Sequence, residues 1–366
     1  MQAPRPHHLL FIGATARWAA QSATRAGIRA SAIDMFGDSD LLREVDRWQR
    51  LEQWSEVANL VPSFNCDAAV FLGGVEARTE TIDEVAALLP VVGPSSEIVS
   101  KLRAPELLDE LVQGTLVRRP QRLEKLDANE LAEPSWLWKQ KGSCGGLGVC
   151  YARSGVLIAS PKNGYYERQM PGRVFGFSFL ATNDGVRFLG AAANLRSGRS
   201  PRPFLYEGCI GPITLADKFV EAASQVAVRM ANATPLRGLF GLDLIIGPDH
   251  SMWLLECNPR ATSSMELLEN DTSLISLHNV ACGGGRLPTL SSSSSLRGKR
   301  VLYRRPNTRP PAGIDRTETD SVLPCSDLPS NIDSVSVGAP LCTLNATGNR
   351  AVDVSRKLAA EAHACE

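Results

Sequence analysis

The sequence has little that would mark a membrane, secreted or nucleic-acid-binding protein. None of its apolar runs approaches the length of a membrane span, so we expect no membrane segment. Its nine cysteines are odd in number and form no Cys-x-x-Cys pair, which favours reduced thiols and a cytoplasmic location. The 39 basic and 39 acidic residues cancel, which gives no support for bulk binding to nucleic acid or an anionic membrane.

Two common nucleotide-binding motifs are also missing. Residues 11–17, FIGATAR, are similar to a dinucleotide loop but lack the GxGxxG spacing, which disfavours an NAD-type oxidoreductase. We interpret Asp34, near the end of the second predicted strand, as a strand-end polar residue rather than a ribose ligand. The glycine-rich stretch 139–149 lacks the GxxxxGK[ST] spacing of a P-loop.

What is present is the composition of an ordinary globular protein with room for two or three domains. Of the 366 residues, 43% are hydrophobic and 21% are charged. Apolar strands at 8–14, 28–35 and 68–72 alternate with helical segments such as 16–26, and residues 91–94 look like one more strand. This alternation predicts a small parallel α/β domain, Rossmann-like in character, over residues 1–97.

The most informative stretch is 241–260, which reads as a β-hairpin. Its two apolar, β-prone runs, Leu242–Ile246 and Met252–Cys257, flank the turn-forming sequence Gly-Pro-Asp-His-Ser. Folding this hairpin about Asp249 sets Asp243 nearly opposite Glu256. Because alternate residues of a strand share a face, Asn258 points to the same side as Glu256.

These oxygen-bearing side chains predict a metal site. Two carboxylates and an amide oxygen, from Asp243, Glu256 and Asn258, suit a hard cation such as Mg²⁺ or Mn²⁺, and Arg260 follows just beyond. The alternative is a surface hairpin with solvated acids. An acid inside each of two apolar strands disfavours it, since burying an unpaired carboxylate is costly.

A second stretch predicts a site for anionic oxygens. A strand at Trp136–Lys139 leads into residues 139–149, whose four glycines allow a backbone conformation with exposed N–H groups. Lys139 would add a positive charge for the same phosphates. The alternative is a plain flexible hairpin loop. We interpret Cys144 and Cys150 as small filler residues, because no histidine or acid near them in sequence suggests activation.

A basic loop and the C-terminal segments complete the pattern. The loop at 196–203 carries three arginines, Arg196, Arg199 and Arg202. It could bind phosphate or an acidic substrate, or it could be a solvated surface loop, and the sequence favours neither. An apolar stripe predicts a core-facing helix at 215–232. Residues 291–295 read as a linker, and residues 296–366 as a small β-rich extension with a closing helix.

Taken together, these pieces resemble the ATP-grasp superfamily, in a carboxylate–amine ligase-like branch that is poorly characterised. The resemblance extends from the N-terminus to about residue 283. It implies an α/β (α+β) fold: a pre-ATP-grasp domain at 1–97, two α+β subdomains clasping ATP at 98–285, and the C-terminal extension at 296–366.

The resemblance also implies roles for individual residues. The glycine-rich loop and its lysine would bind phosphate, and the segment YERQM would be the adenine-binding hinge. The implied nucleotide-binding residues are Arg103 or Lys101, Lys139, Gly145, Gly146, Glu167, Arg168 and Met170. The implied metal ligands are Asp243, Glu256 and Asn258. Arg260 and Lys139 would be catalytic.

The sequence departs from the family pattern at two places. Members usually carry a further lysine where the chain enters the ATP domain. Here that place reads Lys-Leu-Arg, so Arg103, favoured by its spacing to Gly114, and Lys101 both stay candidates. Some members also place a ribose-binding acid seven residues past the hinge glutamate, where this sequence has Val174.

The resemblance implies an ATP-dependent ligase with ATP and Mg²⁺ (or Mn²⁺) as cofactors. A small-molecule carboxylate would be phosphorylated, and an amine or thiol would attack the acyl-phosphate, with release of ADP and phosphate. The alternatives are a kinase or carboxylase with another acceptor, and a nucleotide-binding protein without turnover. The sequence leaves the oligomeric state open, although homodimers are common in such ligases.

Overall fold

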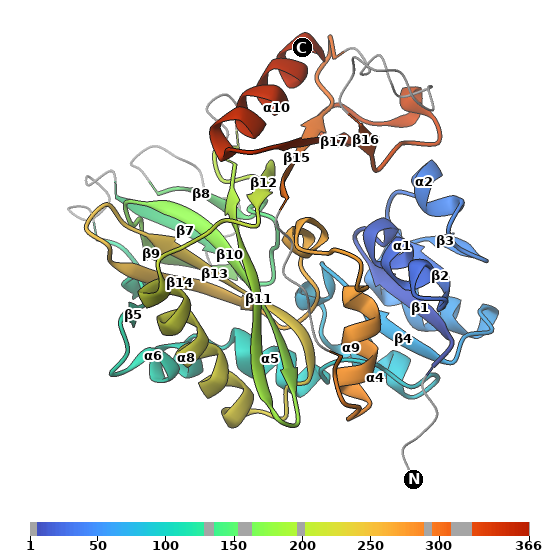
Figure 1. The fold of residues 1–366 in the computed structure, drawn as a ribbon, viewed down its shortest axis with the longest axis horizontal. Coiled ribbons are helices and arrows are strands. Elements are labelled where there is room, and N and C mark those ends of the chain that lie inside the picture. Colours follow the sequence, from blue (N-terminus) through green and yellow to red (C-terminus); the bar gives the residue numbers. More distant parts are fainter. Residues whose placement is uncertain are drawn as a thin grey trace.

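The protein is described by a computed structural model covering residues 6–127, 135–152, 163–195, 202–288, 295–308 and 324–365. Its strands form three sheets, which helices cover (Figure 1). This arrangement confirms the predicted mixture of α/β and α+β organisation. Among these residues there is no helix with the length and hydropathy that a membrane crossing requires.

The N-terminal part is a parallel sheet in the order β3-β2-β1-β4, as the alternating pattern predicts. Its elements are β1 (His8–Gly13), α1 (Arg17–Arg25), β2 (Arg29–Asp34), α2 (Ser39–Leu42), β3 (Trp48–Arg50), α3 (Val57–Leu60), β4 (Ala68–Phe71) and α4 (Glu80–Ala86). Leu9 and Phe11 pack with α1 on one face, while Leu10 and Ile12 pack with α3 and α4 on the other. Residues 91–94 form no further strand, because Val91 makes only an isolated bridge to Ala69.

A nine-stranded sheet forms the body of the molecule, in the order β16-β17-β15-β12-β11-β10-β13-β14-β5. Its strands and helices up to residue 282 are α5 (Ser96–Arg103), α6 (Pro105–Val112), β5 (Val117–Arg118), β10 (Arg173–Thr182), β11 (Gly185–Asn194), β12 (Gly208–Gly211), α8 (Asp217–Ala233), β13 (Gly238–Ile246), β14 (Met252–Asn258) and α9 (Leu274–Cys282). The predicted stripe of α8, which includes Phe219, Val226 and Met230, packs on this sheet. The β13–β14 hairpin lies near one edge of this sheet, where only β5 follows β14.

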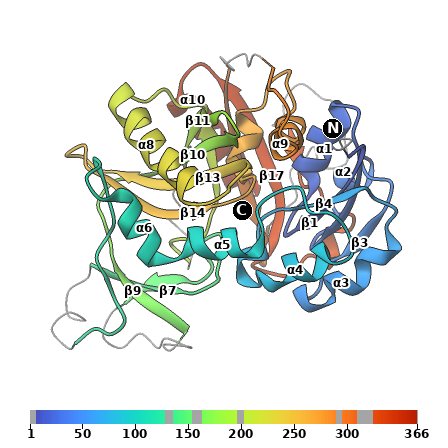
Figure 2. The same cartoon turned by 90° about the horizontal axis from the view of Figure 1, so that it is seen from below.

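A small antiparallel sheet in the order β6-β9-β7-β8 lies below α6 and β14 in the view of Figure 2. Its strands are β6 (Arg122–Leu123), β7 (Trp136–Gln140), β8 (Val149–Tyr151) and β9 (Gly164–Arg168). Trp136 and Trp138 bury one of its faces. Strand alternation therefore places Leu137 and Lys139 on the other face.

The C-terminal extension continues the large sheet. Its elements are β15 (Leu296–Tyr303), β16 (Cys325–Ser326), β17 (Pro340–Gly348) and α10 (Ala351–Cys365). β15 pairs with β12, so no sheet boundary separates the predicted units 98–285 and 296–366. Similarly, α9 packs against α1 in the N-terminal core. The three predicted units thus share both a sheet and a core, and their boundaries stay a prediction.

Candidate functional site

The predicted hairpin forms, and it brings the two acids together. Asp243 on β13 lies directly opposite Glu256 on β14, and Gly241 lies opposite Asn258. The side-chain amide of Asn258 donates hydrogen bonds to Asp243 Oδ2 at 3.2 Å and to Glu256 Oε1 at 3.3 Å. Across the sheet, Gly176 pairs with Asp243, and a Cβ added there would lie 3.5 Å from Asp243 Oδ1 and 3.4 Å from Ser264 Oγ.

The electrostatics of this cluster suit a divalent cation. Burial and the nearby Glu256 carboxylate raise the pKa of Asp243 to about 8. A cation between the two carboxylates would remove that repulsion. The described residues hold no group of three His, Cys, Asp or Glu side chains able to bind a metal. The donor set here is therefore two carboxylates and one amide, which fits a cation that keeps water and phosphate oxygens as further ligands.

The Asn258 amide is held from its other end by Arg260. Its Oδ1 accepts a hydrogen bond from Arg260 Nη2 at 3.3 Å, so the amide nitrogen faces the acids. To offer its oxygen to a cation, the amide must turn over, which exchanges these hydrogen bonds. The structure thus brings all four predicted hairpin residues together, with Asn258 poised between Arg260 and the acid pair.

Of the two candidate cations on α5, only Arg103 lies at the acid pair. Arg103 Nη2 is 3.6 Å from Glu256 Oε2, and Nη1 donates to the backbone oxygen of Cys257 at 3.4 Å. Lys101 instead points to solvent and pairs with Glu97 at 2.7 Å.

Lys139 and the hinge residue Glu167 form a buried ion pair on adjacent strands. Burial lowers the pKa of Lys139, but Glu167 and Tyr165, and then Glu256, outweigh it and raise the pKa above its ordinary value. Glu167 Oε2 is buried without a hydrogen-bond partner among the described residues. An orphaned acceptor beside a lysine suits a ligand that brings both an amino group and anionic oxygens.

The other predicted hinge residues are placed differently. Arg168 lies on the opposite face of β9 from Glu167, where its guanidinium sits 5.4 Å from the centre of the Trp136 ring. Met170 is half-buried just beyond the strand. Val174 pairs with Ile245 inside the large sheet. The face of β9 that carries Glu167 is thus the one turned toward Lys139.

The glycine-rich loop is folded against two other parts of the chain. Gly145 and Gly146 have φ values of 62° and 75°, the left-handed region that glycine tolerates. The backbone oxygen of Gly145 accepts a hydrogen bond from Tyr206 at 2.9 Å. A Cβ on Gly146 would lie 1.8 Å from the Phe204 oxygen, and one on Gly142 would lie 3.4 Å from Ala77 Cα. The loop therefore has no room for a side chain at Gly146, whereas Gly142, with a φ of 72°, favours glycine through its backbone conformation.

Cys144, in this loop, lies close enough to Glu76, Arg260 and Glu256 for their charges to act on it. Burial and the Glu76 carboxylate raise the pKa of its thiol, which suits the predicted filler role. Glu76 is a further residue of this candidate site, and no motif in the sequence indicates it. The available signal was an acid just after Gly73-Gly74, at the carboxyl end of a parallel strand, where α/β sheets bind ligands.

The remaining candidates lie elsewhere. Asp34 accepts hydrogen bonds from Ala16 N at 3.1 Å, Gly37 N at 2.9 Å and Trp48 Nε1 at 2.8 Å. Its carboxylate is thus used structurally, in agreement with the strand-end interpretation. Arg196 and Arg199 of the basic loop are outside the described residues.

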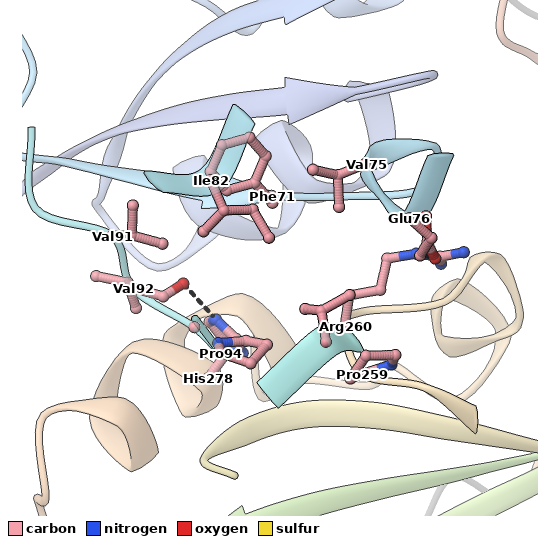
Figure 3. A pocket seen from close by; sticks show the side chains of 12 residues that line it. Phe71, Val75, Glu76, Ile82, Val91, Val92, Pro94, Pro259, Arg260 and His278 are labelled. Carbon is pink, nitrogen blue, oxygen red and sulfur yellow. Dashed lines mark hydrogen bonds and ion pairs between the residues drawn. The ribbon is translucent and has the colours of Figure 1, made fainter. Parts of the chain in front are cut away.

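A cavity beside Arg260 is too small to be a nucleotide site. Mainly apolar side chains line it, including Phe71, Val75 and Ile82 (Figure 3). His278 at its edge is held by Leu239 N at 2.9 Å and by the Val92 oxygen at 3.0 Å. Its volume of about 10 Å³ accepts one water molecule at most.

Comparison with known proteins identifies the fold. The family model described as ATP-grasp domain matches residues 101–264. A search of curated proteins finds no significant match. The matched residues 101–264 include the acid pair, Lys139, Arg103 and the glycine-rich loop. The prediction of an ATP-grasp superfamily protein is therefore confirmed over the matched residues 101–264.

Solved structures with the same fold cover nearly the whole chain. N5-carboxyaminoimidazole synthetase from Staphylococcus aureus, in complex with ADP, has a TM-score of 0.69 at 14% identity, covering 99% of this chain and 98% of that one. The biotin carboxylase domain of Hydrogenobacter thermophilus 2-oxoglutarate carboxylase, with MgADP and bicarbonate, has a TM-score of 0.73 at 12% identity, covering 100% and 91%. Carboxyaminoimidazole ribonucleotide synthase from Aspergillus clavatus, with ATP, has a TM-score of 0.72 at 15% identity, covering 100% of both chains.

Proposed function

We propose that the protein is an ATP-dependent ligase that joins a small-molecule carboxylate to an amine or thiol through an acyl-phosphate, releasing ADP and phosphate. The observation that carries this proposal is the convergence of opposite charges from two sheets. Arg103 Nη2 lies 3.6 Å from Glu256 Oε2 of the large sheet, and Lys139 of the small sheet pairs with Glu167. Burial lowers the pKa of Lys139, Glu167 and Tyr165 raise it, and the Glu256 carboxylate adds to the rise, so both cations face the acid pair. The ligands in the related structures support ATP as that ligand.

Each site residue has a physical task in this reaction. Glu167 Oε2 would accept a hydrogen bond from the adenine amino group, and Lys139 would contact phosphate oxygens. Asp243, Glu256 and Asn258 would hold Mg²⁺, which when bound offsets the repulsion between the anionic carboxylate and the phosphates. Arg260 would stabilise the negative charge that develops on the transferred group, a contribution of about 3–4 kcal/mol for one well-placed donor.

The glycine-rich loop would keep water from the acyl-phosphate. It already contacts Ala77 in the N-terminal part and Phe204 on the far side. A loop that closes on both sides of a reactive intermediate protects it from hydrolysis. No side-chain nucleophile is needed, because the substrate carboxylate itself attacks the γ-phosphate.

A carboxylase is the second candidate. The related structures include carboxyaminoimidazole synthetases and a biotin carboxylase domain with bicarbonate. In that case bicarbonate would be the carboxylate that ATP phosphorylates, at the same residues. Bicarbonate-dependent ADP release, with label from bicarbonate in the product, would favour this candidate over the ligase.

The first test is thermal unfolding with and without Mg·ATP. Ligand at a hundred times its dissociation constant should stabilise the folded protein by roughly 2.7 kcal/mol. We expect a magnesium-dependent rise in melting temperature that is lost in Lys139→Ala and Glu256→Gln. Lys141→Ala is the matched control, because Lys141 is exposed in the same segment. A screen of carboxylates and amines for ADP release would follow.

A protein that no nucleotide stabilises would contradict the proposal. A shift by Mg·ATP without ADP release across carboxylates, bicarbonate included, would instead favour the nucleotide-binding protein without turnover. Equal shifts for the wild type and Lys139→Ala would place the nucleotide elsewhere.

A further inference from the structure

Glu76 links the N-terminal part of the molecule to Arg260. It lies in a short 3-10 turn at Val75–Ala77, just past the carboxyl end of β4. Its side chain is 1% exposed and forms an ion pair with Arg260, 184 residues further along the chain (Figure 3). Burying the Glu76 carboxylate costs desolvation energy, which its contacts with other groups must offset. These contacts therefore show what the carboxylate does in the structure.

Both oxygens of Glu76 are occupied. Oε1 accepts from Arg260 Nε, and Oε2 accepts from the backbone N–H of Gly74 at 2.8 Å. Burial raises the pKa of Glu76, but Arg260 and Arg103 outweigh it and hold the pKa below its ordinary value. The carboxylate is therefore ionised and held at both of its oxygens.

The same contacts determine how Arg260 is presented. Nε is held by Glu76, Nη1 donates to the Ala261 oxygen at 3.1 Å, and Nη2 donates to Asn258 Oδ1 at 3.3 Å. The guanidinium lies against Gly73, where an added Cβ would be 3.4 Å from Cζ. Each terminal nitrogen carries two hydrogens, so one N–H remains on each of Nη1 and Nη2. That pair is the fork that binds two oxygens of a phosphate or carboxylate.

We infer that Glu76 is a positioning residue, which fixes the Arg260 guanidinium so that its Nη1–Nη2 fork meets the terminal phosphate of ATP. The inference rests on the proposed binding of ATP in this domain. Without the Glu76 carboxylate, Arg260 Nε loses its acceptor, and the Arg260 side chain can change rotamer and move its guanidinium away from Gly73. Recognition of the γ-phosphate then weakens, whereas the adenine and the first two phosphates, held by other residues, are unaffected.

The test compares two nucleotides by titration calorimetry. Mg·ADP lacks the γ-phosphate, and Mg·AMP-PNP is a non-hydrolysable analogue that has one. In Glu76→Gln we expect the Kd of Mg·AMP-PNP to rise about tenfold, the effect of one weakened charge-assisted hydrogen bond, and that of Mg·ADP to change less than twofold. Arg260→Lys should show the same selective loss. Glu56→Gln, at an exposed glutamate of the same part, should match the wild type for both nucleotides.

The outcomes separate this inference from the proposed function. A wild type that binds neither nucleotide overturns both. A wild type that binds both, with a Glu76→Gln variant that loses both equally or neither, overturns the positioning role alone. Should Glu76→Gln fail to fold, Glu76→Asp keeps the charge but shortens the side chain by one methylene. We then expect a smaller rise in Kd, still confined to Mg·AMP-PNP.

Discussion

At the scale of single residues, solvent exposure distinguishes Lys101 from Arg103, the two candidates for the nucleotide contact that sequence spacing leaves undecided. Lys101 and Arg103 are both in the last turn of α5, and Leu102 between them is buried in the core. The side chain of Lys101 is 57% exposed, whereas that of Arg103 is 20% exposed and faces Glu256. A helix advances 100° per residue, so two positions apart means nearly opposite faces. Only Arg103 can act at the acid pair.

We therefore expect Arg103→Gln to weaken Mg·ATP binding and Lys101→Gln to leave it unchanged. Loss of a charged donor beside the phosphates should raise the Kd about tenfold, because hydrogen bonds to charged groups contribute about 1.5–3 kcal/mol. The Lys101 variant should stay within twofold of the wild type. Titration calorimetry of both variants measures this, and the reverse ranking would assign the contact to Lys101.

At the scale of elements, the glycine-rich loop shows why two neighbouring glycines are not equivalent. Both Gly145 and Gly146 are left-handed. A Cβ on Gly145 would meet nothing within 4 Å, whereas one on Gly146 would overlap the Phe204 backbone. Gly145 needs glycine only for its φ value, while Gly146 needs it also for close approach.

The loop contact predicts different effects for the two alanine variants. In Gly146→Ala the overlap should force the loop away from residues 204–206 and expose the Tyr206 N–H, which bonds to Gly145. We expect hydrogen exchange at Tyr206 to become at least about tenfold faster, the loss of roughly 1.4 kcal/mol of local protection. Gly145→Ala should pay only the conformational cost of about 1 kcal/mol and keep the contact. Equal exchange in both variants would contradict this account.

At the scale of the whole molecule, one carboxylate joins three parts of the chain. Glu266, in the turn after the hairpin, pairs with Arg17 of α1 and with Lys299 of β15 at 2.8 Å. Arg17 also donates from Nε to Asp327 of the C-terminal extension at 2.9 Å. Burial raises the pKa of Glu266, but Lys299 and Arg17 outweigh it and lower the pKa to about 2. This cluster joins the N-terminal part to the C-terminal extension.

The depressed pKa of Glu266 predicts an acid-dependent loss of stability. A carboxylate whose folded pKa is below its unfolded value stabilises the protein above the unfolded value, about 4.5, and this contribution disappears as the pH falls toward 2. A shift of this size corresponds to about 3 kcal/mol. Glu266→Gln should lower the free energy of unfolding by at least that amount at pH 7, because Lys299 and Arg17 are buried and each loses one of its partners.

Urea unfolding, followed by tryptophan fluorescence at pH 7 and pH 4, measures this contribution. The wild type should lose more stability between the two values than Glu266→Gln does. Glu110→Gln, at an exposed glutamate of α6, is the control and should behave as the wild type. An unchanged midpoint for Glu266→Gln at pH 7 would contradict the linking role.

The local pattern of the sequence was enough for most of the elements and for the core of the site. Alternating apolar runs with a turn predicted β13 and β14, and a period of two set Asp243 opposite Glu256. Helical spacing predicted the core stripe of α8. These features depend on neighbours within about twenty residues, which is why the sequence alone determines them. Residues 91–94 meet the edge of β4 at a single bridge and go no further, because Gly93 has a φ of 146° and Pro94 has no N–H to pair.

Only the tertiary structure decided which distant residues meet. The ion pair of Glu76 with Arg260, the choice of Arg103 over Lys101 at the acid pair, and the Glu266 cluster join positions far apart in the chain. The sequence predicted three successive units, yet the extension adds strands to the sheet of the ATP-grasp domain. The sequence by itself therefore determined which chemical groups the candidate site carries, since these follow from the residue types. The folded chain decided the orientation of those groups, because burial and charge act through space.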